Sequence, residues 1–339
     1  MQRVLVTGAN GQIGSELVAA LRERAGVEHV VGADLRPPPG APAGNGSATA
    51  SGPHEVLDVR DRAALERAMR EHHVDTVFHL ASLLSASGEE APDRAWDVNT
   101  NGLKHVLDLA RACGENNEGR RDGADHSVRV FWPSSIAAFG PATGTPAPQQ
   151  AVLDPQTMYG VTKVSGEFLC RYYHQKYGVD VRGLRYPGLV SHAAPPGGGT
   201  TDYAVEMCRA AAEERSYTCF LEPATRLPMM YMPDALRATL DLMDAPAEAL
   251  TARTSYNVGA LSFTAAELAE ALAARAPGGF DCRYEPDPER QQIADSWPAT
   301  VDDQPARDDW GWQPQYNLGA LADDMIGHLQ AGFKSKVEG

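Results

Sequence analysis

The stretch "VLVTGANGQIG", residues 4–14, decides the fold. It begins with a short apolar run typical of a buried strand, and a glycine-rich turn follows. Gly8, Gly11 and Gly14 have G-x-x-G-x-x-G spacing. Such glycines let the backbone approach a pyrophosphate closely, and the helix that follows offers free N–H groups and a partial positive charge. The stretch therefore predicts a strand, a dinucleotide-binding turn and a helix.

Strand and helix patterns alternate through the rest of the N-terminal half. Helix-like segments lie within residues 62–72 and 102–114 and after residue 158. Strand-like runs recur within residues 29–35, 75–82, 128–135 and 180–188. This alternation predicts an α/β protein with a doubly wound, mostly parallel Rossmann sheet.

The alternation loosens in the C-terminal half. We expect residues 1–187 to form the nucleotide-binding domain, and the chain to return to it around residues 231–260. Residues 188–230 and 261–339 are expected to form a smaller α/β substrate-binding lobe. In open α/β sheets, ligands bind beside the carboxyl ends of the strands, which is where this lobe would lie.

Asp34 lies twenty residues beyond Gly14, at the end of the second predicted strand. A carboxylate at this place binds both ribose hydroxyls of NAD and repels the 2′-phosphate of NADP, so we expect NAD as the cofactor. The alternative for Asp34 is a turn-initiating residue before "RPPPG". Arg36, close by, is able to accept a 2′-phosphate. Asp58 follows the third strand, where the adenine would lie.

Composition and charge limit the class of partner. The chain has 339 residues, of which 43% are hydrophobic and 22% charged, as in ordinary soluble proteins. A net charge of −15 argues against nucleic acid or an anionic membrane as the main partner. No apolar run approaches the ~20 residues of a membrane span, and no signal or transit pattern opens the chain, so we expect a cytoplasmic protein.

Five scattered cysteines without a C-x-x-C motif fit reduced thiols, and we expect no metal site. Residues 36–53, rich in Pro, Gly and Ala, interrupt the alternation of elements. Residues 114–127, which are polar and glycine-rich, interrupt it a second time. Both are predicted to be mobile surface insertions.

"MYGVTK", residues 158–163, places Tyr159 and Lys163 four residues apart, and therefore on one helix face. A free tyrosine has a pKa of about 10, and a fixed cation nearby lowers it. The pair therefore suits a general base and its tuning charge. The alternative is a surface tyrosine with a lysine that reaches to solvent.

A second pair, Tyr172 and Lys176, has the same spacing. At roughly 100° per residue, it faces nearly the other side of the helix, so only one pair can serve the site. Ser134 and Ser135 end the fifth predicted strand at the edge where a nicotinamide would project. One loop can bring the start of the following helix next to this edge, which favours Tyr159 over Tyr172.

Four motifs together resemble the extended short-chain dehydrogenase/reductase family, over nearly the whole chain: "TGANGQIG" (7–14), "PSSIAAFGP" (133–141), "YGVTK" (159–163) and "LRYPG" (184–188). Members of that family use a Ser or Thr, a Tyr and a Lys in catalysis. The resemblance implies these roles for Ser135, Tyr159 and Lys163, and it selects Ser135 rather than Ser134. The two insertions depart from the family pattern but leave its motifs intact.

Motifs of the second half resemble the short-chain-type L-threonine 3-dehydrogenases: "RYPGLVS" (185–191), "GGGTTDYAVEM" (197–207), "LPMMYMPDA" (227–235), "RQQIADSWP" (290–298) and "DDWGWQP" (308–314). The resemblance implies oxidation of L-threonine by NAD⁺ to 2-amino-3-oxobutanoate in threonine catabolism. It implies Tyr159 as the base, Lys163 as the group that lowers the tyrosine pKa, and Ser135 as the group that orients the hydroxyl. A homodimer is expected on the same ground.

The residues expected to contact the cofactor gather at the strand ends and the catalytic helix: Gly8, Asn10, Gly11, Gln12, Ile13, Gly14, Asp34, Asp58, Val59, Leu80, Ala81, Ser82, Asn99, Tyr159, Lys163, Tyr186 and Pro187. Substrate contacts are expected at Ser82, Ser135, Tyr159, Thr200, Thr201 and Trp297. A helix N-cap is the alternative role for Thr200 and Thr201, and packing of the smaller lobe is the alternative for Trp297.

Two other functions stay open. A UDP-sugar 4-epimerase or dehydratase would use the same scaffold, but it needs basic residues for a second pyrophosphate, and the C-terminal lobe is poor in lysine. A non-catalytic NAD-sensing regulator could dispense with the Ser, Tyr and Lys, all of which are present.

Overall fold

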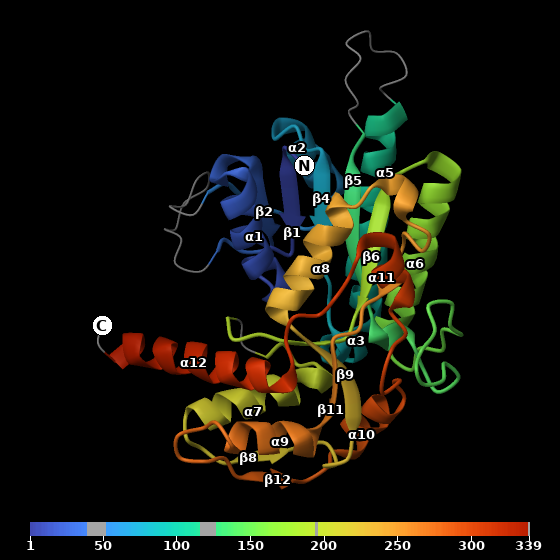
Figure 1. Cartoon of the computed structure of the whole chain (residues 1–339). Helices are drawn as coiled ribbons and strands as arrows, with labels where there is room; N and C mark the ends of the chain where they lie inside the picture. The colour runs from blue at the N-terminus through green and yellow to red at the C-terminus, as the bar shows by residue number, and fades with distance from the viewer. Residues whose placement is uncertain (39–51, 116–126, 194–195, 338–339) are drawn as a thin grey trace.

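A parallel sheet forms the centre of the protein (Figure 1). The computed structural model describes residues 1–38, 52–115, 127–193 and 196–337, so most of the two predicted insertions lies outside the described residues. Within these ranges, seven strands pair in the order β10-β6-β5-β4-β1-β2-β3, and every neighbouring pair is parallel. The strands are β1 (Val4–Thr7), β2 (Val30–Asp34), β3 (His54–Val56), β4 (Thr76–His79), β5 (Arg129–Ser135), β6 (Val181–Tyr186) and β10 (Tyr256–Asn257).

This order confirms the predicted doubly wound sheet. The direction of strand succession reverses between β1 and β4, and ligands bind at such a reversal, outside the carboxyl ends of the strands. The residues of β1 alternate between two cores, with Val4 and Val6 on one face of the sheet and Leu5 on the other. All three are almost fully buried, because helices cover both faces.

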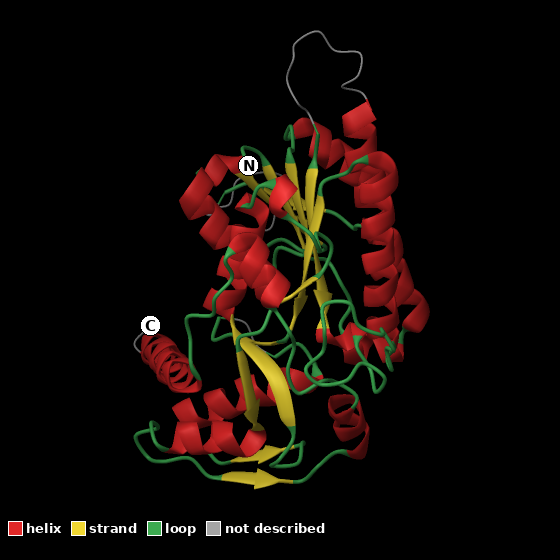
Figure 2. Ribbon diagram, turned by 45° about the vertical axis from the view of Figure 1, so that its right-hand side comes forward, coloured by secondary structure: helices red, strands yellow, loops and turns green. Residues whose placement is uncertain are grey.

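The helices divide between the two faces (Figure 2). Helices α1 (Gln12–Ala25) and α8 (Met232–Asp244) pack on the face of Val4 and Val6. Helices α2 (Arg62–Glu71), α5 (Gly102–Glu115) and α6 (Met158–Tyr177) pack on the face of Leu5. No helix among the described residues is both long and apolar enough to cross a membrane.

Three short elements between β4 and α5 were missed from the sequence. They are α3 (Ser85–Glu90), α4 (Pro92–Trp96) and a π-helical turn (Asp97–Asn101). Each has six residues or fewer, which is too short to establish a hydrophobic period.

A smaller lobe lies beyond the carboxyl ends of the large sheet, at the bottom of Figure 1. It holds a three-stranded sheet of β7 (Gly188–Val190), β9 (Arg226–Tyr231) and β11 (Leu261–Thr264), and a pair formed by β8 (Tyr217–Cys219) and β12 (Cys282–Tyr284). Its helices are α7 (Tyr203–Ala212), α9 (Ala265–Ala273), α10 (Pro288–Asp295) and α12 (Leu318–Val337).

One more helix, α11 (Gln304–Trp310), adds to the large domain. Its Ala306, and Trp312 just beyond it, pack in the same core as Val4 and Val6. Residues 261–339, which were predicted to lie in the smaller lobe, therefore include a second segment that returns to the large domain. The exact domain limits remain a proposal.

The turn between β1 and α1 leaves no room for side chains at two of its glycines. Gly8 has a φ of +71°, and a Cβ atom built on it would lie 2.7 Å from the backbone nitrogen of Ala81. A Cβ atom on Gly14 would lie 2.1 Å from the carbonyl oxygen of Gly8. The backbone of helix α1 therefore packs directly against the backbone of the turn. This close contact positions the N-terminus of the helix at the carboxyl edge of the sheet.

We expect Gly14→Ala to lower the free energy of unfolding by about 2 kcal/mol or more, because the added methyl group meets backbone atoms. Gly327→Ala is the matched control: this helical glycine of α12 is exposed and has no atom within 4 Å of a built Cβ. The control should be neutral or gain about 0.5–1 kcal/mol from its helix propensity. Urea unfolding followed by circular dichroism measures both, and equal small effects would contradict the close approach of α1.

Candidate active site

Two adjacent cavities open at the carboxyl edge of the large sheet. The first is bounded by the turn after β1 and by the ends of β2 and β4, and its lining includes Gly8, Gly11, Asp34, Asp58, Val59, Leu80, Ala81 and Ser82. The second is bounded by the start of α1, the end of β5, the start of α6 and the smaller lobe. Its lining includes Gln12, Ile13, Ser135, Tyr159, Lys163, Tyr186, Pro187, Thr200, Thr201 and Trp297. Leu80 and Ser82 line both cavities.

Three residues predicted to contact the cofactor, Asn10, Gly14 and Asn99, line neither cavity. The backbone N–H of Asn10 donates to Asp34, at 3.0 Å. The Asn99 side chain accepts from the N–H of Leu83 at 2.8 Å and donates to its carbonyl at 3.0 Å, which holds the loop after β4. These residues support the cavity walls, and their direct contact with the cofactor stays a prediction.

The turn after β1 fits a dinucleotide. Gly11 is the N-cap of α1 and makes no side-chain capping bond, so the first N–H groups of the helix face the cavity without a side-chain partner. The buried side-chain nitrogen of Gln12 has no hydrogen-bond partner in the described part of the chain. An unsatisfied buried donor costs about 1–3 kcal/mol, and a pyrophosphate oxygen would satisfy it.

Asp34 lies at the end of β2, on the wall of the first cavity. One carboxylate oxygen accepts from the N–H of Asn10, and the other accepts from the N–H of Leu35 at 2.8 Å. A carboxylate has about four acceptor positions, so capacity remains for two ribose hydroxyls. Arg36 is exposed and does not line this cavity.

Asp58 carries a partner that was missed from the sequence. Arg60 binds its carboxylate with a closest distance of 2.6 Å, and this hydrogen bond holds the pKa of the Asp58 carboxyl below its usual range. Arg60 and Arg94 both line the first cavity. The position of Arg60 in the sequence could have indicated this role, because "DVR" (58–60) comes soon after the third strand, at the edge of the sheet where ligands bind.

The predicted base stands at the start of α6. Thr157 caps the helix by accepting from the N–H of Gly160 at 3.1 Å, so Tyr159 occupies the first turn. The ammonium of Lys163 lies 5.2 Å from the ring centre of Tyr159 and donates to the carbonyl of Pro133 at 2.7 Å. Ser135, at the end of β5, and Tyr159 line the same cavity. The structure thus brings the three predicted catalytic residues together.

The direction predicted for the tyrosine pKa is wrong for the protein alone. Burial raises the pKa of Tyr159 to about 12, and the hydrogen bond with Ser135 opposes this rise. Burial also lowers the pKa of Lys163 to about 7, opposed by Cys170 and Glu167. A lysine with this pKa is only partly charged near neutral pH, so loss of solvent outweighs the effect of the cation.

Ser134 and Ser135 have different partners. The hydroxyl of Ser134 donates to Glu167 at 2.6 Å, and Glu167 forms a buried ion pair with Arg185 at 2.7 Å. Ser134 is therefore engaged within the protein, whereas Ser135 reaches Tyr159. Tyr172 is 47% exposed and lines neither cavity, as its position on the helix predicts.

The smaller lobe closes the second cavity. Asp202 accepts from the N–H groups of Gly198 at 2.7 Å and Gly199 at 2.8 Å, so neither Thr200 nor Thr201 provides the cap before α7. Trp297 lines the cavity and also packs on the lobe core, which is compatible with both of its predicted roles. Residues missed from the sequence also line it: Leu84 and Ser85 beyond β4, Pro133 in β5, Ile136 and Ala137 directly after β5, Gly188 and Leu189 in β7, and Gly199 and Asp202 before α7.

Comparison with known proteins agrees with this geometry. A sequence profile of the NAD dependent epimerase/dehydratase family matches residues 4–259. An uncharacterized epimerase/dehydratase of Staphylococcus saprophyticus is 42% identical over 339 residues, which is 100% of both chains.

Two solved structures are similar over nearly the whole chain. The GalE-like L-threonine dehydrogenase from Cupriavidus necator, in its holo form, is 49% identical with a TM-score of 0.88, covering 96% of this chain and 99% of that one. The L-threonine dehydrogenase from Clostridium difficile is 43% identical with a TM-score of 0.89, covering 98% of both chains. NAD is therefore the cofactor of this protein.

We expect Asp34→Ala to raise the dissociation constant for NAD⁺ at least about tenfold, because hydrogen bonds to a charged acceptor are lost. Preference for NAD⁺ over NADP⁺ should relax, since the repulsion of the 2′-phosphate is removed. Calorimetric titration with each cofactor measures this. Asp281→Ala, which removes an exposed carboxylate of the smaller lobe, is the control. Equal affinity of the unmodified protein for both cofactors would contradict the role of Asp34.

Proposed function

The chain belongs to the NAD-dependent epimerase/dehydratase family, and we propose that it oxidises L-threonine at its β-hydroxyl to 2-amino-3-oxobutanoate, with NAD⁺ as the hydride acceptor. At the level of the family, it is an NAD-dependent oxidoreductase with a Rossmann domain. The observation that carries the proposal is the gathering of Ser135, Tyr159 and Lys163 on one wall of the second cavity, opposite the smaller lobe. The similarity to solved L-threonine dehydrogenases supports this choice of substrate.

Removal of a hydride from the β-carbon of threonine requires a base for the hydroxyl proton. We propose that Tyr159, as the phenolate, accepts this proton while the C–O bond becomes a carbonyl, and that Ser135 donates to the reacting oxygen. When bound, NAD⁺ supplies the hydride acceptor and a positive charge. Lys163, when charged, stabilises the phenolate with the protons that its bond to Pro133 leaves free.

The substrate is a small zwitterion, so its site needs donors for a carboxylate and acceptors for an ammonium. The hydroxyls of Ser82, Thr200 and Thr201 lie on the wall of the second cavity and are able to serve both. We propose that Trp297 covers the bound amino acid from the side of the smaller lobe. Action as a homodimer stays a prediction from the family resemblance, and location in the cytoplasm stays a prediction from the sequence.

The cavity is poorly suited to a UDP-sugar. A second pyrophosphate would need cationic partners, and Lys163 is the only lysine or arginine among the described residues that line the second cavity. A non-catalytic NAD sensor would not need the contact between Tyr159 and Ser135. Threonine oxidation therefore accounts for more of the observed side chains than either alternative.

We expect Tyr159→Phe to lower kcat by about 10²-fold or more while NAD⁺ binding stays intact, because only the titrating oxygen is lost. Tyr172→Phe removes the same atom from the same helix at an exposed position and should leave kcat unchanged. NADH formation from L-threonine, followed by absorbance, compares the two variants. Activity that survives in Tyr159→Phe and is lost in Tyr172→Phe would identify the other tyrosine as the base.

We expect Lys163→Met to move the acid limb of the kcat profile up by about one pH unit or more. Methionine fills much of the same volume, but without the cation the phenol pKa rises and the phenolate forms only at higher pH. A pH series of NADH formation measures the shift. A lower kcat with an unmoved profile would mean that Lys163 acts through binding or position and leaves the pKa of Tyr159 unchanged.

A further inference from the structure

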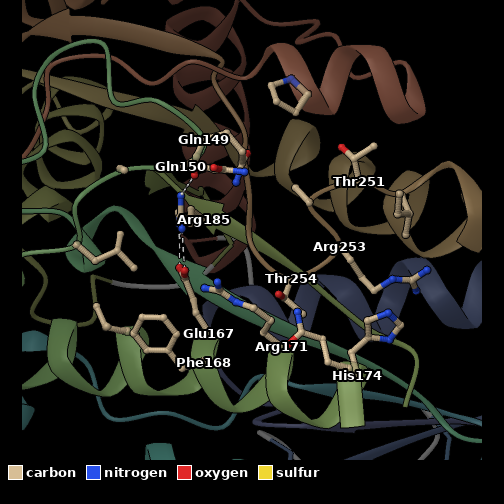
Figure 3. Close-up of a pocket in the computed structure, with 17 residues that line it drawn as sticks. Gln149, Gln150, Glu167, Phe168, Arg171, His174, Arg185, Thr251, Arg253 and Thr254 are labelled. Carbon is tan, nitrogen blue, oxygen red and sulfur yellow. Dashed lines mark hydrogen bonds and ion pairs between the residues drawn. The ribbon is translucent and has the colours of Figure 1, made fainter. Parts of the chain in front are cut away.

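A third cavity, of about 820 Å³, lies between α6 and the loops around residues 149–153 and 250–254 (Figure 3). It shares no lining residue with the two cavities of the active site. Its volume lies within the range of small-molecule sites, about 300–1,000 Å³. We propose that it binds a small polyanion through carboxylate or phosphate oxygens, at a site separate from that of NAD and threonine.

The charges on the α6 wall favour an anion. Glu167 is the only acidic residue that lines the cavity within the described chain, and its carboxylate is occupied by Arg185, at 2.8 and 2.7 Å, and by Ser134. Arg171 is exposed on the same wall, and no carboxylate in the described ranges forms an ion pair with it. Its guanidinium lies 5.1 Å from the ring centre of Phe168, which holds it at the cavity. One full positive charge therefore remains there.

The opposite wall adds to this excess. Arg253 lines the cavity and pairs with Asp180 at 2.8 Å. Asp180 also pairs with Arg129 at 2.8 Å and with Arg182 at 2.9 Å. Three guanidinium groups thus share one carboxylate, and the cluster carries two excess positive charges. In a chain with a net charge of −15, such a concentration of cations creates a local potential that attracts anions.

Neutral donors complete the lining. Gln150 and Thr254 line the cavity, and their side chains have no hydrogen-bond partner among the described residues. Figure 3 shows the side chains of Glu167 and Arg171 on one helix, with those of Gln150 and Thr254 on neighbouring segments. Oxyanions accept from such convergent donors.

The third cavity and the active site are joined through α6. Lys163 lies one turn before Glu167, and Glu167 holds Ser134, the neighbour of Ser135. A bound anion next to Arg185 would compete with Glu167 for its guanidinium and so change the support of the catalytic residues. This kinetic consequence rests on the proposed function, whereas binding of the anion does not.

The test is calorimetric titration of the full-length protein, saturated with NAD⁺ so that its pyrophosphate site is filled. Citrate, which presents carboxylate oxygens, and inorganic pyrophosphate, which presents phosphate oxygens, are the two probes. The probe that binds more tightly shows which kind of oxygen the site prefers. We expect one site per chain. Arg171→Glu should weaken binding at least about tenfold, because a charge-assisted contact becomes a repulsion.

The matched control is Arg67→Glu, which makes the same charge change at an exposed position of α2, away from the cavity. It should leave binding unchanged. Failure of both probes to bind the unmodified protein, or equal weakening in both variants, would overturn the proposal. Arg171→Gln, which removes the charge without reversing it, should give a smaller loss and separates charge from misfolding. Because the readout is binding, a failure of threonine oxidation leaves this test unaffected.

Discussion

The buried ion pair between Glu167 and Arg185 is the interaction on which the arrangement of the site depends. Glu167 comes from α6 and Arg185 from β6, and the pair gathers Ser134 of β5, Asn257 of β10 and the carbonyl of Gln149. A buried pair is tolerated only when its remaining hydrogen-bonding positions are satisfied, and each of these contacts does so. One pair therefore joins three neighbouring strands to the helix that carries Tyr159. Its geometry sets how the start of α6 meets the end of β5.

Burial also shapes the electrostatics of the active site. Tyr159 is partly buried and Lys163 is buried, and the loss of solvent favours the neutral form of each group. The protein alone therefore holds a protonated phenol beside a lysine that is only partly charged. The positive charge of bound NAD⁺ and the hydrogen bond from Ser135 act in the opposite direction. The proposed base therefore depends on Ser135 and on the bound cofactor for its phenolate form.

Helix α6 also connects the active-site cavities with the third cavity. Its first turn faces the active-site cavities, and the turns from Val164 to Gln175 line the third cavity. The charge balance of the two regions differs, because Lys163 is the only lysine or arginine among the described residues that line the second cavity, whereas arginines gather around the third. The Glu167–Arg185 pair lines the third cavity, and Glu167 also contacts Ser134, which lines the second cavity.

The sequence by itself determined the alternating strands and helices, the glycine turn and the choice of Tyr159 over Tyr172, because hydrophobic period, glycine spacing and helix angle are local properties. It also indicated many residues of the two active-site cavities, since several of them lie at or soon after strand ends. Only the tertiary structure decided the pKa of Tyr159, the engagement of Ser134 by Glu167, the pairing of Arg60 with Asp58 and the third cavity. Each of these arises where segments far apart in the chain exclude water or bring charges together. Such desolvation and pairing depend on distances in space, which spacing along the sequence does not contain.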